Sequence, residues 1–99
     1  TTASFESEVL ESDLPVLVKF WAPWCTSCVA MAPVLEEFAE ENADRIRVVK
    51  VNVMEEQDLI MPYSIRSLPA LKLFVGGEEV HTSIGPRNKQ QLEEIFLNR

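Results

Sequence analysis

Hydrophobic residues in this chain form two kinds of pattern: apolar runs typical of buried strands and spacings typical of amphipathic helices. The run from Val16 to Trp21 is apolar on both faces apart from Lys19, which predicts a central strand covered by helices on both sides. From Cys25 to about Asn42 the apolar positions follow a helical period. We expect Pro33, inside this stretch, to kink the helix because it lacks a backbone donor.

Shorter elements complete the predicted order. They are a helix over about Ser4 to Ser12 with Ser4 as its N-cap, a strand over Ile46 to Met54, a short acidic helix over Glu55 to Ile60 or Met61, strands over Ala70 to Val75 and Glu79 to Ile84 joined by a Gly76-Gly77 hairpin, and a last helix capped by Asn88. Strand–helix–strand units require parallel pairing and a hairpin requires antiparallel pairing. The order therefore predicts one α/β domain over residues 1–99, with a mixed sheet of about four strands flanked by helices.

The chain is acidic, with a formal net charge of −7 and nine scattered Lys and Arg residues. Because phosphate binding needs clustered positive charge, we expect no nucleic-acid partner. The longest apolar runs are too short to span a bilayer, so we expect no membrane partner. Thr1 to Ser4 lack the basic and apolar segments of a signal peptide, although a mature chain would lack them too. We expect a cytoplasmic protein. We also expect a monomer.

Both cysteines of the chain, Cys25 and Cys28, lie where the predicted central strand ends and a helix begins. Unpaired backbone N–H groups at a helix start favour a thiolate. The loop between the two cysteines is too small to stabilise a fold, which leaves a catalytic or a metal role. Zinc needs four ligands, and the one histidine, His81, lies far away in a predicted strand. We therefore favour redox chemistry, with no metal and no cofactor.

Further motifs surround the cysteine pair. They are Phe20-Trp21-Ala22-x-Trp24-Cys25-x-x-Cys28, Pro33, the strand Val48 to Val53 with Lys50 and Asn52, Tyr63 to Pro69, Leu73-Phe74-x-Gly76-Gly77-Glu78 and Gly85. A lone Cys-x-x-Cys is a weak signal, but this combination in one small domain is specific. Over essentially its whole length the chain resembles the thioredoxin family.

The resemblance implies a three-layer thioredoxin-like sandwich that acts as a protein disulfide oxidoreductase on client proteins with disulfides, supplied by a thioredoxin-reductase-type electron donor. It implies that Cys25 is the partly exposed nucleophile and Cys28 the buried resolving thiol. Pro69 would follow a cis peptide bond that faces the sulfurs. The implied substrate surface consists of Trp24, Leu68, Pro69, Ile84 and Gly85.

The chain departs from the family between the cysteines and beneath them. Thr26-Ser27 replaces the usual Gly-Pro, and both hydroxyls could donate to a sulfur anion, which would make the couple more oxidising. Lys19 replaces a buried Asp that usually pairs with a lysine, here Lys50. Either one of these lysines is neutral or its stem reaches outward, and we expect Lys19 to be partly charged, with its head in water or near a carboxylate.

The usual N-terminal strand is expected to be missing, because Phe5 of the first helix lies too close to Thr1. Ile46 to Val53 would then be an edge strand, protected by Arg47 and Lys50. Three functions stay open. They are a general disulfide oxidoreductase, a more oxidising exchange partner dedicated to one client, and a binding module that keeps the fold without turnover.

Overall fold

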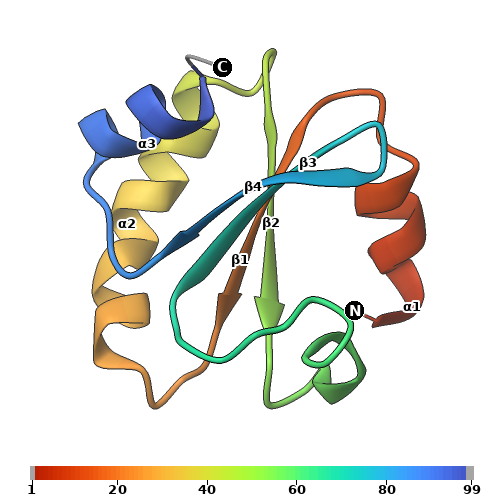
Figure 1. Cartoon of the computed structure of the whole chain (residues 1–99). Helices are drawn as coiled ribbons and strands as arrows, with labels where there is room; N and C mark the ends of the chain where they lie inside the picture. The colour runs from red at the N-terminus through yellow and green to blue at the C-terminus, as the bar shows by residue number, and fades with distance from the viewer. Residues whose placement is uncertain (1, 98–99) are drawn as a thin grey trace.

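The computed structural model describes residues 2–97. The elements in chain order are α1 (Thr2–Phe5), η1 (Glu6–Leu10), β1 (Val16–Trp21), α2 (Thr26–Glu41), β2 (Arg47–Asn52), η2 (Gln57–Leu59), β3 (Ala70–Val75), β4 (Glu78–Ile84) and α3 (Lys89–Phe96). In Figure 1, α2 and α3 lie on one side of the sheet and α1 lies on the other. This is the layered α/β architecture predicted from the sequence.

The strands form one mixed sheet in the order β2-β1-β3-β4. β2 runs parallel to β1, whereas β3 is antiparallel to both β1 and β4. The four-stranded sheet and the central position of β1 confirm the prediction. Within residues 2–97, β2 has no neighbour on its outer side, and Arg47 and the half-exposed Lys50 lie on this open edge.

β1 contributes to a hydrophobic core on each face of the sheet. Val16, Val18 and Phe20 pack with Phe5 and Phe74 beneath the N-terminal helix, in line with the alternation of strand side chains. The opposite face packs against α2 and α3. Its buried residues are Leu17, Met31, Leu35, Phe38, Ile46, Leu71, Leu73, Leu92 and Phe96. Lys19 shares the face of Leu17 by the same alternation, so its side chain extends under α2.

Capping residues set the bounds of the two longer helices. Cys25 is the N-cap of α2, and the backbone N–H of Asn42 closes its other end on the carbonyl of Phe38. Pro33 lies inside α2, as expected. Asn88 caps α3 through a capping box, because its side chain accepts from the Gln91 N–H while the Gln91 side chain accepts from the Asn88 N–H.

Several predicted boundaries are wrong. The first helix begins by Thr2, so Ser4 lies inside it and is not its N-cap. The sequence between β2 and β3 forms only the single 3-10 turn η2, because Glu56 before it has non-helical angles and Pro62 disfavours helical backbone at the residue before it. The second predicted strand is shorter than expected, since turns close on Asn42 and Asn52 at its two ends.

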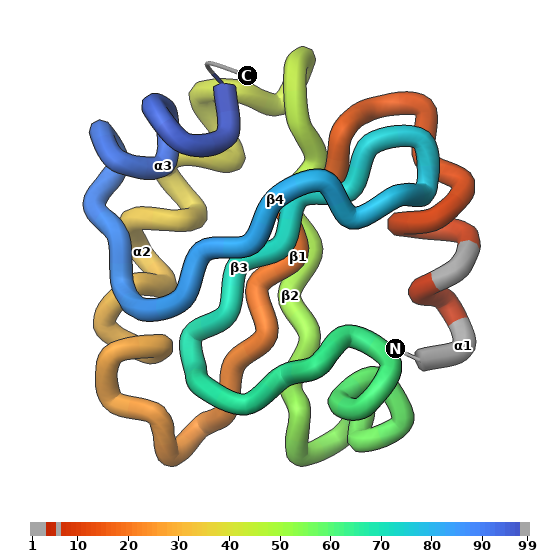
Figure 2. Tube along the Cα trace, in the orientation of Figure 1, coloured from red at the N-terminus to blue at the C-terminus, as the bar shows by residue number. Residues whose placement is uncertain are grey.

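The segment between β2 and β3 crosses the end of the sheet where β1 and β2 both finish, as Figure 2 shows in green. Its residues Leu59 and Tyr63 pack onto the core cluster of Phe5 and Phe20. Within residues 2–97, no helix is both long enough and apolar enough to cross a membrane.

Candidate active site

The cysteine pair lies on a tight connection between β1 and α2. The N–H of Cys25 donates to the carbonyl of Ala22 at 3.0 Å, which turns the chain directly after the strand. Cys25 then takes an extended conformation with φ −85° and ψ 102°, and its Sγ accepts the backbone N–H of Cys28 at 3.2 Å. Its sulfur thus occupies the place of the oxygen of a common N-cap residue. The partial positive charge at this helix start favours the thiolate form of Cys25.

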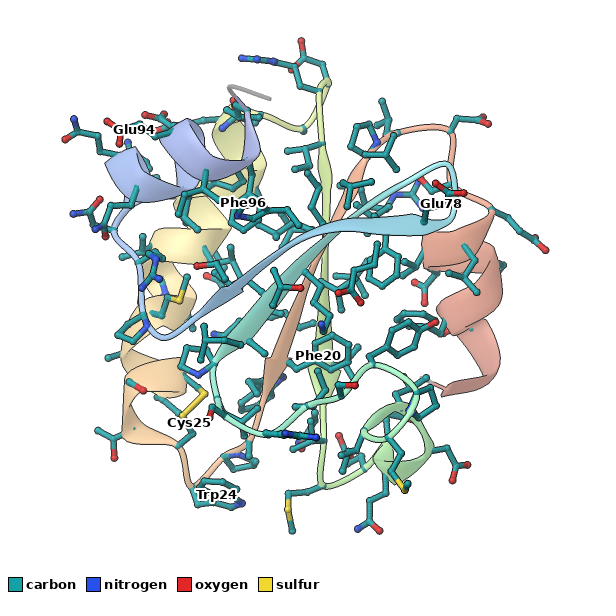
Figure 3. All side chains as sticks on the ribbon, in the orientation of Figure 1. Phe20, Trp24, Cys25, Glu78, Glu94 and Phe96 are labelled. Carbon is teal, nitrogen blue, oxygen red and sulfur yellow. A yellow bond between two sulfur atoms is a disulfide. The ribbon has the colours of Figure 1, made fainter. Side chains whose placement is uncertain are left out.

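Cys25 and Cys28 are joined by a disulfide, and their Cα atoms are 5.2 Å apart. Figure 3 shows this bond in yellow next to the Cys25 label, with Trp24 at the outer end of the molecule. Cys25 keeps 8% of its surface exposed, and Cys28 keeps none. Cys25 is therefore more buried than expected, but it is the one cysteine of the pair with exposed surface.

The two residues between the cysteines have different surroundings. The Ser27 hydroxyl lies 3.5 Å from the Sγ of Cys25, close enough for a weak hydrogen bond to sulfur. The Thr26 side chain is exposed, and within residues 2–97 its hydroxyl makes no contact with either sulfur. Of the two hydroxyls that could donate to a thiolate, the structure thus brings one to the nucleophile.

Lys19 lies beneath the helix start and is 1% exposed. Its Nζ donates to the carbonyl oxygen of Cys28 at 2.7 Å. The prediction that the head reaches water or a carboxylate is wrong, because α2 covers β1 at this point and the Cys28 carbonyl provides a nearer acceptor. Burial lowers the pKa of Lys19, and the neighbouring ammonium of Lys50 lowers it further, whereas Glu36 raises it. Lys50 itself is half exposed, with its Nζ 3.8 Å from a Glu36 oxygen.

An open, mainly apolar groove of about 480 Å³ begins at Cys25. Its lining residues are Trp24, Cys25, Val53, Ile60, Ile65, Arg66, Ser67 and Leu68. Trp24 is 66% exposed and forms part of the wall. The groove thus joins the end of β1, the end of β2 and the segment before β3.

The predicted substrate surface matches this groove in part. Trp24 and Leu68 line it, whereas Pro69, Ile84 and Gly85 do not. Pro69 is buried after a cis bond from Leu68, as predicted, and its carbonyl accepts the Gly85 N–H at 2.9 Å. Ile84 pairs with Ala70 across the sheet and is 47% exposed.

Sequence reasoning missed the walls formed by Val53, Ile60, Ile65, Arg66 and Ser67. All five lie between β2 and β3, where no regular period indicates which side chains turn toward the cysteines. The one available signal was that Ile65, Arg66 and Ser67 belong to the Tyr63 to Pro69 motif. Within residues 2–97, no group of three or more His, Cys, Asp and Glu side chains could hold a metal ion.

A reversible disulfide with one sulfur at a groove and the other covered by a helix is suited to thiol–disulfide exchange. A second disulfide can approach the outer sulfur, while the inner sulfur is already placed to close on it. The fold and site therefore define a dithiol–disulfide oxidoreductase.

Comparisons with known proteins identify the family. The family model described as Thioredoxin matches residues 1–98, and the chain belongs to this family. It is 48% identical to Thioredoxin 1 of Synechococcus elongatus over 93% of this chain and 86% of that protein. It is 44% identical to the Rickettsia bellii thioredoxin, over 99% and 93%. It is 48% identical to the Porphyra purpurea thioredoxin, over 97% and 90%.

The protein is accordingly a protein disulfide oxidoreductase that works by thiol–disulfide exchange through the Cys25–Cys28 pair. Membership of the family implies, in general terms, client proteins that carry disulfides and a reductase as partners.

Proposed function

We propose that this chain, acting as one domain, is a general reductant of disulfides in client proteins, with Cys25 as nucleophile and Cys28 as resolving thiol. The observation that carries the proposal is that Cys25 lines the groove while Cys28 is fully buried behind it. The Cys28 N–H at 3.2 Å from the Cys25 Sγ and the helix start behind it supply the charge that a thiolate nucleophile needs.

The reaction takes place in two exchanges. The thiolate of reduced Cys25 attacks one sulfur of the client disulfide, forms a mixed disulfide and releases the other client sulfur as a thiolate, which takes up a proton. Cys28 then loses its proton and attacks the Cys25 sulfur, which releases the second client thiolate, and this thiolate also takes up a proton. The client gains two electrons and two protons, and the protein is left with the Cys25–Cys28 disulfide observed in the structure.

The groove would bind the client chain beside the reacting sulfur. Trp24 and Leu68 offer apolar contact, and the backbone around Pro69, Ile84 and Gly85 would hold the segment in an extended conformation. The apolar lining at the Cys25 end of the groove supports the part of this assignment that concerns Trp24 and Leu68.

A second candidate function, a more oxidising exchange partner for one client, is favoured by the buried amine of Lys19 and the hydroxyl of Ser27. A positive charge at Lys19 stabilises a thiolate and therefore the reduced dithiol, and the Ser27 hydroxyl acts in the same sense at Cys25. Lys50 restrains this effect by lowering the pKa of Lys19. In its neutral form Lys19 could instead accept the Cys28 proton, as water could. Thr26 would influence the redox potential only through the backbone geometry at the start of α2.

For the physiological setting we propose a monomer in the cytoplasm, reduced by a thioredoxin-reductase-type electron donor. The support comes from the resemblance to relatives called thioredoxin along nearly the whole chain. Sedimentation of the protein tests whether it is a monomer, and the rate at which such a reductase reduces the Cys25–Cys28 disulfide tests the electron donor.

Reduction of insulin by dithiothreitol tests the main proposal. The wild-type chain should accelerate precipitation of the insulin B chain, and Cys25→Ser should abolish the acceleration. Cys28→Ser should accumulate a mixed disulfide with the client, because the resolving thiol is gone. Brief treatment of the reduced protein with iodoacetamide should alkylate Cys25 before Cys28, and the reverse order would contradict the assigned roles. A redox titration against glutathione separates the two candidate functions.

A further inference from the structure

The groove at Cys25 continues into a second cavity farther along the segment between β2 and β3. This cavity has a volume of about 290 Å³ and is lined by Ile60, Met61, Ser64, Ile65 and Arg66. Three of these residues, Ile60, Ile65 and Arg66, also line the groove that contains Cys25. The two cavities therefore form one continuous surface, and an extended chain that enters at the sulfur passes Arg66 as it leaves.

Arg66 is the one charged side chain among the described residues that line either cavity. It is exposed and makes no hydrogen bond or ion pair with the rest of residues 2–97, so its guanidinium is free to bind a partner. By contrast, Lys50, Lys72 and Lys89 each lie within 4 Å of a carboxylate of the chain itself. An unpaired guanidinium presents several donors in a plane, which fits a carboxylate with two parallel hydrogen bonds.

The net charge of the molecule is opposite in sign to the charge of Arg66. With a formal net charge of −7, the protein repels an acidic segment over most of its surface. Within the groove and the adjoining cavity, a carboxylate on a client chain would therefore be attracted at Arg66, the one charged side chain of the described residues that line them. The resulting attraction would favour client segments that place an acidic side chain beside Arg66.

We propose that Arg66 is a specificity-determining residue that selects client segments carrying an acidic side chain close to the attacked cysteine. This proposal rests on the proposed function, because it assumes that clients bind in the groove at Cys25. The acidic side chain contacts the Arg66 guanidinium while the neighbouring residues of the segment lie on the apolar walls. Because Arg66 is exposed, the pair contributes a selectivity of about two- to fivefold at low ionic strength.

Peptide pairs that differ only in Glu against Gln test the proposal. Each peptide holds one cysteine as a mixed disulfide with 2-thiopyridine, a neutral leaving group, and the variable residue is moved through three positions on either side of the cysteine. The pre-reduced protein attacks the peptide sulfur, and released thiopyridone reports the second-order rate constant. Dividing each rate by the rate of the same peptide with dithiothreitol removes the effect of Glu on intrinsic reactivity.

We expect the wild-type protein to prefer Glu over Gln at one or more positions by about two- to fivefold. Arg66→Gln should reduce this ratio to about one, Arg66→Lys should keep part of it, and Arg66→Glu should invert it. Half-molar salt should weaken the wild-type preference because the pair is exposed to solvent. Arg47→Gln is the matched control, since it removes the same charge at the start of β2, the end of the sheet remote from the groove, and should keep the ratio.

Equal rates for Glu and Gln at every position would overturn the proposal, as would a preference that survives in Arg66→Gln. These results differ from failure of the proposed function. If the reduced protein attacks none of the peptides, the exchange reaction itself is misassigned, whereas attack on all of them without preference removes only the role of Arg66.

Discussion

Replacing Lys19 by Met tests whether the buried amine beneath the helix start sets the redox potential of the cysteine pair. Methionine keeps an unbranched side chain of similar length and loses the Nζ that donates to the Cys28 carbonyl. A positive charge at this place stabilises the thiolate and so the reduced dithiol. Its removal should therefore make the couple more reducing.

The size of the shift follows from the position of the amine. The Nζ lies 2.7 Å from the carbonyl oxygen of Cys28, and the N–H of the same residue bonds the Cys25 Sγ at 3.2 Å, so the amine and the nucleophilic sulfur contact opposite ends of one residue. A unit charge about 6 Å away at an effective dielectric constant of about 20 is worth about 3 kcal/mol, an upper limit because burial favours the neutral amine. A change of one thiol pKa unit is about 1.4 kcal/mol. For a two-electron couple these values correspond to a lowering of about 30 to 60 mV.

The assay equilibrates the protein with a series of thiol–disulfide buffers, alkylates free thiols and counts the modified fraction by mass. A graded series strengthens it: Lys19→Asp reverses the charge and should lower the potential further than Lys19→Met. Lys50→Met removes a half-exposed charge, which water screens, and should shift the potential less. A potential in Lys19→Met that equals or exceeds that of the wild type would refute the reasoning and leave Ser27 as the residue that tunes the site.

Three further predictions concern the same helix start, the titration of Lys19 and the last helix. Ser27→Ala removes the hydroxyl 3.5 Å from the Cys25 sulfur and should lower the potential by about 10 to 30 mV in the same titration; Thr26→Ala, its control, should leave it unchanged. Burial lowers the pKa of Lys19 in the folded protein. At a pH between this lowered pKa and the ordinary value for lysine, Lys19 is protonated in the unfolded chain but not in the folded one. The free energy of unfolding of the wild type therefore rises with pH in this window. In urea unfolding, the free energy of unfolding of Lys19→Met minus that of the wild type should become smaller as pH rises toward 10. A difference that grows with pH would contradict this reasoning. Asn88→Ala breaks the capping box of α3 and should cost about 1 kcal/mol in urea unfolding, whereas no loss would mean that packing alone holds the helix.

The parts of the structure that sequence predicted are those in which local chemistry and burial agree. Val16 to Trp21 has no polar face to turn outward apart from Lys19, and it forms the central strand. Asn88, three residues before Gln91, has the spacing of a capping box and caps α3. Cys25 follows a buried strand and precedes a helical period, and it begins the helix.

The parts that failed depend on contacts between distant segments. Lys19 and Lys72 both lie in buried strands. The Nζ of Lys72 forms an ion pair with the carboxylate of Glu79 at 2.9 Å, whereas the Nζ of Lys19 donates to the carbonyl of Cys28. The alternation of side chains along a strand predicts which face of the sheet a lysine lies on, but it does not predict which hydrogen-bond acceptor lies next to that lysine. In the same way, Ile65 and Arg66 lie in a segment without a period, so their place in the groove depends on how the segment packs on the core.

The open edge of β2 also implies a gradient of amide protection across the sheet. The N–H of Arg47 donates to the carbonyl of Pro15, just before β1, and the N–H of Val53 donates to the carbonyl of Trp21 at the end of β1. Alternation along the strand directs the amides of Val48 and Lys50 away from β1. These outward amides, like those on the outer side of the other edge strand β4, should exchange with deuterium sooner than the amides of β1, which has a neighbouring strand on each side. Slow exchange at Val48 and Lys50 at high protein concentration, with fast exchange after dilution, would show instead that two molecules meet along this edge.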